Sequence, residues 1–150
     1  PRTTEANDSQ LSADIALIKT AVQLIDNLAI DPCASQAKVF VPISQTTGTQ
    51  LLTGTASNRT YVCQLTLNTA TAQNFALISG TGTVCATSPG AMTGGTTAGT
   101  GFNAAANWGV VLGTGGHTVA KSATDAVNVC LVMSSTGQLS GVLSYVVAPN

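Results

Sequence analysis

Apolar residues in the first fifth of the chain follow a helical repeat. Five of them are spaced four and three residues apart, as in a heptad seam: Leu11, Ile15, Ile18, Val22 and Ile25. A second apolar stripe containing Leu17 and Leu24 runs beside this seam. The pattern predicts a helix over 11–30 that ends at Asp31-Pro32, because the residue before a proline is pushed out of the α region. Two stripes favour a helix that meets other copies in a short trimeric stem, and the alternative is a helix packed on its own domain.

From Lys38 onward the period changes to two. Alternating segments occur at 38–43, 50–53, 59–67, 74–78, 107–112, 117–120, 126–133 and 138–147. Within 59–67 the alternation places Tyr61, Cys63, Leu65 and Leu67 on one face. The stretch 79–106 is rich in glycine, threonine and alanine, and we expect long loops there.

Short strands separated by frequent turn signals predict a mainly β protein. The expected fold is an antiparallel β-sandwich of jelly-roll type preceded by one N-terminal α-helix. We therefore divide the chain into an arm and helix, 1–32, for anchoring or oligomerisation, and a β-sandwich domain, 33–150.

Charged residues form only 7% of the chain, with a net charge of -1. None occurs between Thr60 and Ala120, and none follows Asp125. Nucleic-acid binding is excluded because it requires clustered lysine and arginine. A membrane span is not expected either, since the apolar stretch 15–30 contains Lys19 and Asp26. An uncharged surface repels itself weakly, so we expect it to be covered in an assembly, the alternative being a Thr/Ser-rich extracellular module.

The inventory of reactive groups argues against an enzyme. After Arg59 the only carboxylate side chain is Asp125, so the paired acids of a glycosidase are missing. A Ser-His-acid triad would have to combine Asp125 with His117 and has no recognisable nucleophile. We expect His117 to be a surface turn residue, and we expect no cofactor. The N-terminus shows no signal peptide, which favours synthesis in a cytoplasm.

The four cysteines, Cys33, Cys63, Cys85 and Cys130, lack the spacing of a zinc site. Cys63 and Cys130 lie on apolar strand faces, where free cysteine acts as a small hydrophobe. Cys33 and Cys85 lie at a helix exit and in a loop, where a bridge forms more easily. All connectivities stay open, with a bridge from Cys33 to Cys85 or Cys130 preferred if the mature protein resides outside a cell.

The larger aromatic residues, Phe40, Phe75, Phe102 and Trp108, are far apart in the sequence. We expect them to be core anchors rather than a stacking platform for bases or sugars.

Several short motifs, taken in order, resemble a family of small proteins of tailed bacteriophages. They are VPISQTTGTQLLTG at 41–54, RTYVC at 59–63, GTGTVC at 80–85, VCL at 129–131 and LSGVLSY at 139–145. The likeness covers most of 33–148. It implies a β-sandwich virion component without enzymatic activity, placed on the capsid exterior or on tail and fibre structures.

The resemblance and the uncharged surface together predict a decoration or cement protein of the virion, favoured as a homotrimer. Its partners would be the major capsid protein or other virion proteins, and the helix seam from Leu11 to Ile25 would form the interface. The competing expectation is a tail-fibre or head-fibre module that binds a host receptor or glycan through the loops of 79–106. The number of copies per particle distinguishes the two expectations: hundreds for a cement protein and tens at most for a fibre module.

Overall fold

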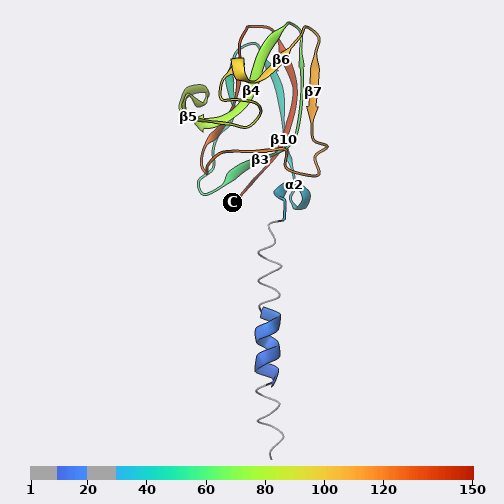
Figure 1. Ribbon diagram of the computed structural model, residues 1–150, viewed down its shortest axis with the longest axis vertical. Helices are drawn as coiled ribbons and strands as arrows, with labels where there is room; N and C mark the ends of the chain where they lie inside the picture. The colour runs from blue at the N-terminus through green and yellow to red at the C-terminus, as the bar shows by residue number, and fades with distance from the viewer. Residues whose placement is uncertain (1–9, 20–29) are drawn as a thin grey trace, which may run out of the picture. The chain divides into compact units, whose positions relative to one another are not determined.

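The computed structural model describes residues 10–19 and 30–150. The chain divides into two units, 1–30 and 31–150, so the division falls two residues before the expected boundary. Residues 10–19 form a helical segment (Figure 1). This segment begins one residue before the helix predicted over 11–30 and covers its first part, while Val22 and Ile25 lie outside the described residues.

The second unit, called the sandwich unit below, contains two five-stranded antiparallel sheets. In the first sheet the order is β1 (Val39–Gln45), β10 (Leu139–Ala148), β3 (Arg59–Thr69) and β7 (Gly109–Leu112), with β8 (Ala120–Lys121) also paired to β3. In the second sheet it is β2 (Thr49–Leu52), β9 (Asn128–Met133), β4 (Gln73–Thr81) and β5 (Thr87–Ala91), with β6 (Phe102–Ala104) paired to β4.

This strand order is that of a jelly roll. When the short β6 and β8 are set aside, the remaining strands run first, eighth, third, sixth in one sheet and second, seventh, fourth, fifth in the other. The prediction of a mainly β, jelly-roll-like sandwich preceded by an N-terminal helix is confirmed.

The main core lies between the inner faces of the two sheets. Leu65, Leu67 and Leu143 from the first sheet meet Leu77 and Leu131 from the second, and each is at most 1% exposed. Burial of a side chain of this size contributes about 1.5–3 kcal/mol. Among the aromatic residues, Phe75 belongs to this core, but Phe40 is 63% exposed, so its prediction as a core anchor is wrong.

A β-bulge in β3 overturns the predicted single apolar face of 59–67. Ser144 pairs with Gln64 and Tyr145 pairs with Val62, so Cys63 has no partner on β10. One extra residue reverses the alternation. Leu65 and Leu67 therefore face the main core, whereas Tyr61 and Cys63 belong to a separate buried cluster with Cys33.

The stretch 79–106 is more ordered than the loops we expected. It contains the 3-10 turn η1 (Thr83–Cys85), strand β5, a second 3-10 turn η2 (Ala98–Thr100) and strand β6. Strand β5 has the sequence TSPGA and is mostly exposed, because it lies at the edge of its sheet, where proline and glycine are tolerated. Conversely, only Ala120 of the strand predicted at 117–120 belongs to a strand, the two-residue β8.

A new short helix begins at Asp31-Pro32. The short helix α2 (Pro32–Ser35) has Asp31 as its N-cap and proline in its first turn, both favoured arrangements for a helix start. Ile30 is not helical. Asp31 thus fixes the point at which the chain enters the sandwich unit.

Candidate functional site

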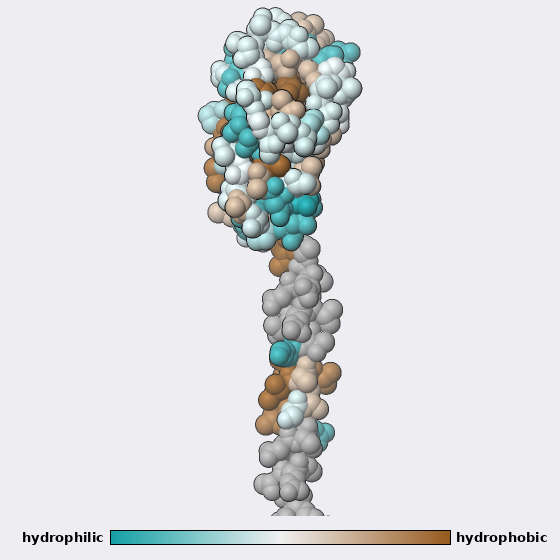
Figure 2. Space-filling model, turned by 90° about the vertical axis from the view of Figure 1, so that its left-hand side faces the viewer, coloured by the Kyte–Doolittle hydropathy of each residue, from teal (hydrophilic) through white to brown (hydrophobic). Residues whose placement is uncertain are grey.

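The apolar seam on the helical segment is the strongest candidate for an interaction surface. Leu11, Ile15 and Ile18 are 59%, 57% and 63% exposed. Leu17, on the adjoining side, is 68% exposed. Figure 2 shows brown, hydrophobic side chains along this segment. The structure thus brings three of the five predicted seam residues onto one exposed stripe, and Val22 and Ile25 lie outside the described residues.

A buried disulfide fastens α2 to the outer face of the first sheet. Cys33 and Cys63 are bridged, with 5.4 Å between their Cα atoms, and both are fully buried. They pack with Tyr61, Val146 and Ala148. The preferred pairing of Cys33 with Cys85 or Cys130 is wrong, because the bulge turns Cys63 away from the main core and towards α2.

A second disulfide, Cys85–Cys130, fastens η1 to the second sheet, with 5.9 Å between its Cα atoms. It holds η1 against the outer face, where Ala76 and Ile78 are buried with it. The chain has no free cysteine, so the interpretation of Cys63 and Cys130 as free hydrophobic residues is also wrong. Closing loops of 30 and 45 residues stabilises the fold by about 4 kcal/mol per bridge in the chain-entropy account.

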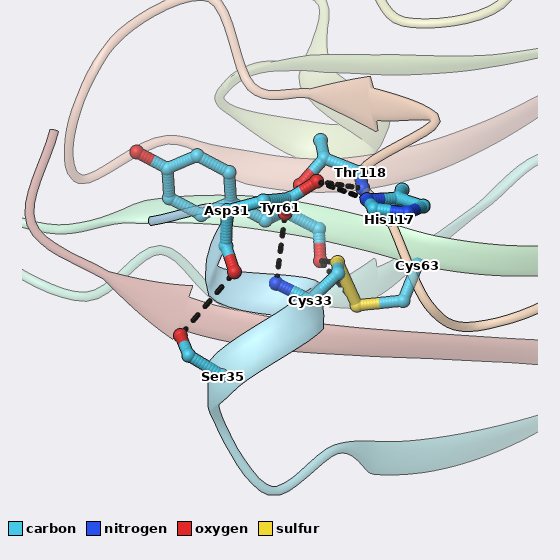
Figure 3. The surroundings of a disulfide bond; sticks show 7 residues. All are labelled: Asp31, Cys33, Ser35, Tyr61, Cys63, His117 and Thr118. Atoms are coloured by element: carbon cyan, nitrogen blue, oxygen red, sulfur yellow. Dashed lines mark hydrogen bonds and ion pairs between the residues drawn. A yellow bond between two sulfur atoms is a disulfide. The ribbon is translucent and has the colours of Figure 1, made fainter. Parts of the chain in front are cut away.

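The carboxylate of Asp31 joins α2 to the loop before β8 (Figure 3). One oxygen accepts a hydrogen bond from the Cys33 N–H at 2.9 Å, and the other accepts from the Thr118 N–H at 2.7 Å. The Thr118 hydroxyl also donates to this carboxylate. These contacts fix the start of the sandwich unit from two directions.

Two opposing effects act on the pKa of Asp31, and the first of them, burial, raises it. Hydrogen bonds from the Thr118 side chain and backbone and from the Cys33 N–H lower it, as does the nearby His117 side chain. The lowering prevails, so the pKa of Asp31 lies below its ordinary value of 3.8.

His117 lies at the surface, as expected, with its side chain 85% exposed. Its nearest acid is Asp31, with 3.6 Å between Nδ1 and Oδ2. Asp125, the acid considered for a triad, instead pairs with Arg59 at 2.9 Å. The triad interpretation therefore has no support in the geometry.

The charges of the sandwich unit gather at one end, which we call the Asp31 end. Arg59 begins β3 and pairs with Asp125, and Lys121 lies opposite Tyr61 on β3. Lys38 immediately precedes β1, which begins beside the last residues of β10. At the opposite end, the segments 69–73, 92–108 and 134–138 contain no charged side chain.

An open notch of about 600 Å³ lies between β2 and η1. It is lined by uncharged residues: Gly48, Thr49, Gln50, Gly82, Thr83, Val84 and Asn128. The Asn128 amide donates to the Gln50 side-chain oxygen at 2.9 Å, so these two amides partly satisfy each other. The notch offers hydrogen bonds but no acid or base.

No protein family, curated protein or solved structure matches the chain in the comparisons. Within residues 10–19 and 30–150, no cluster of three or more histidine, cysteine or acidic side chains could hold a metal ion. In the same part of the chain, no helix combines the length and apolar character required to cross a membrane.

Removing either disulfide is expected to destabilise the fold and to free a different segment. Cys33→Ala/Cys63→Ala and Cys85→Ala/Cys130→Ala should each lower the free energy of unfolding in urea by about 2–4 kcal/mol. Limited proteolysis should then cut near α2 in the first variant and near η1 in the second. Unchanged stability and an unchanged cleavage pattern in both variants would contradict the covering role of the bridges.

Asp31→Asn is expected to remove a pH-dependent part of the stability. A lowered pKa in the folded state contributes stability that is present above the unfolded pKa and is lost as the pH falls through the folded pKa. At neutral pH the variant should be less stable by about 1 kcal/mol. This difference should shrink as the pH falls below 3.8.

Urea unfolding at several pH values checks this, with Asp125→Asn as the matched control. The side chain of Asp125 is 45% exposed, against 28% for that of Asp31, so its ion pair should contribute less. A loss in Asp31→Asn that does not change with pH would contradict the assignment.

Proposed function

We propose that the protein is a structural component of a tailed-bacteriophage virion and decorates the capsid exterior as a homotrimer. The observation that carries the proposal is the exposed seam of Leu11, Ile15 and Ile18. It precedes a sandwich unit that has its own buried core and two disulfides. An apolar stripe of this spacing is typical of a helix that packs against other helices.

The energetics favour association through this stripe. Each large aliphatic side chain transferred from water into a helix bundle contributes about 1.5–3 kcal/mol. Three copies that bury their seams against one another would therefore offset a large part of the entropy lost on association. Large apolar patches that stay exposed are typical of interaction sites.

The surface of the sandwich unit supports an assembled protein as well. With a net charge of -1 and 7% charged residues, copies repel one another weakly when crowded on a particle. Two disulfides in 150 residues fit a protein that works outside a reducing cytoplasm, for example on a virion surface.

In this proposal the trimer stabilises the capsid by bridging neighbouring capsomers. A stable protein interface buries about 1,600 Å², and a trimer at a local symmetry axis would form several such contacts. Their burial opposes the opening of seams under the pressure of the packaged genome. The role requires surface complementarity and stability and needs no catalytic group.

Light scattering of the purified full chain tests the trimer. The expected mass is about 45 kDa, three times the 15.0 kDa of one chain. Ile15→Asp/Ile18→Asp should reduce it to the monomer mass, because charge in the seam cannot be buried without a partner. The control Ser12→Asp/Ala13→Asp adds the same charge to the same segment outside the seam and should stay trimeric. A monomeric wild-type chain would contradict the seam as an assembly element.

Quantitative mass spectrometry of purified particles of the phage that encodes the chain tests the place in the virion. Hundreds of copies per particle are expected for a capsid decoration protein. Tens of copies would favour the fibre module instead. Absence from the particles would overturn both.

A further inference from the structure

Three aromatic side chains that are distant in the sequence meet at the uncharged end of the sandwich unit, which we call the Trp108 end. The ring centroids of Phe75 and Phe102 are 5.4 Å apart, and that of Trp108 lies 6.2 Å and 6.1 Å from them. Phe75 is buried, but Phe102 and Trp108 are only partly buried. The three residues are distant in the sequence but adjacent in the fold, and Phe102 and Trp108 pack against the main core, as expected of core anchors.

Trp108 is held in place by its backbone. Its carbonyl accepts from the Thr69 N–H at 2.9 Å, and its own N–H donates to the Ala105 carbonyl at 3.3 Å. The preceding Asn107 is exposed and has a φ of 60°, a conformation that asparagine tolerates. Among the described residues, no acceptor is bonded to the indole N–H of Trp108, and this group is not a buried atom without a partner, so it is accessible to solvent.

The turns around the cluster are cross-linked by polar side chains. The buried Gln73 amide donates to the Thr69 hydroxyl at 2.7 Å and to the Gly137 carbonyl at 3.0 Å. Its oxygen accepts from the Ser135 hydroxyl at 3.2 Å. This network joins the turn after β3 to the turn before β10. The Trp108 end is therefore pre-organised, and ligand binding would lose little entropy in ordering it.

The chemistry around the aromatics is uncharged. The flanking segments 69–73, 92–108 and 134–138 supply only hydroxyl, amide, thioether, aliphatic, aromatic and backbone groups. Apolar rings with a few polar groups around them are typical of small-ligand sites. A charged ligand would find no counter-charge here.

We infer that the Trp108 end binds a neutral saccharide. The faces of Trp108 and Phe102 would pack against the apolar face of a sugar ring. The free indole N–H and the exposed Asn107 amide would bond its hydroxyl groups. This site goes beyond the decoration role and does not depend on it, since it uses no residue of the helix seam.

Trp108 is the only tryptophan of the chain, so its fluorescence reports directly on the site. The full-length chain is titrated with neutral oligosaccharides of glucose, galactose and N-acetylglucosamine, and with sialyllactose and sulfated lactose as charged probes. A saturable fluorescence change with at least one neutral probe, and weaker binding of the charged probes, is expected. No saturable change with any neutral probe, or tighter binding of a charged one, would overturn the inference.

Variants locate the binding, measured by calorimetry with the best neutral probe. Trp108→Phe keeps a packed ring and removes the N–H, and Asn107→Gly keeps the backbone conformation and removes the amide. Each lost hydrogen bond should weaken binding roughly tenfold. The control Thr83→Ala, in the notch beside β2, should bind like the wild type.

Thermal unfolding of each variant checks that it is folded. If Trp108→Phe does not fold, the affinity of Asn107→Gly alone tests the proposed site. Wild-type affinity in every folded variant of the Trp108 end, or loss of binding in Thr83→Ala alone, would overturn the assignment.

Discussion

A two-layer sandwich has four faces, and only the two inner ones can bury each other. In this chain the outer faces also carry apolar side chains near the disulfides: Tyr61 and Val146 on the first sheet, Ala76 and Ile78 on the second. Each sheet needs a separate cover, and the chain supplies α2 for one and η1 for the other. Both covers are too short to be stable alone, which gives the two disulfides a clear physical role. The Asp31 carboxylate holds the first cover from its other side.

Much of this architecture could be predicted from the pattern of the sequence. The alternation of apolar and polar residues located most strands, because the side chains of a half-buried strand point alternately to the core and to solvent. The number and spacing of these segments then indicated the jelly-roll class. The helical repeat around Leu11 correctly indicated a helix there. Strand β5 was missed because TSPGA carries no alternating pattern.

The cysteine pairing depended on one residue that the pattern cannot reveal. Without the bulge at Cys63, alternation puts this side chain with Leu65 in the core, out of reach of a segment on the outer face. The bulge reverses its direction and makes the bridge to Cys33 possible. Likewise, Phe75, Phe102 and Trp108 meet only through the pairing of β4 with β6 and of β3 with β7, and sequence distance hides such tertiary proximity. The seam residues Leu11, Ile15 and Ile18, in contrast, depend on local helical spacing alone.

The placement of charge connects the proposed role to the fold. The charged side chains of the sandwich unit lie at the Asp31 end, where the chain enters, and the opposite end is neutral. Assembly through the helix seam and contact with neutral ligands at the Trp108 end would use different residues of the chain. Neither activity requires a catalytic centre, in agreement with the sparse inventory of acids and bases.

The central claim is that the helix seam joins copies of this chain, and distances between copies test it most directly. Since all four native cysteines are bridged, Ala13→Cys introduces a single thiol on the exposed helical segment for a spin label. Pulsed electron paramagnetic resonance on the full chain should give one short, well-defined distance between labels, with the modulation depth of three interacting spins. Absence of dipolar coupling between copies would contradict the account.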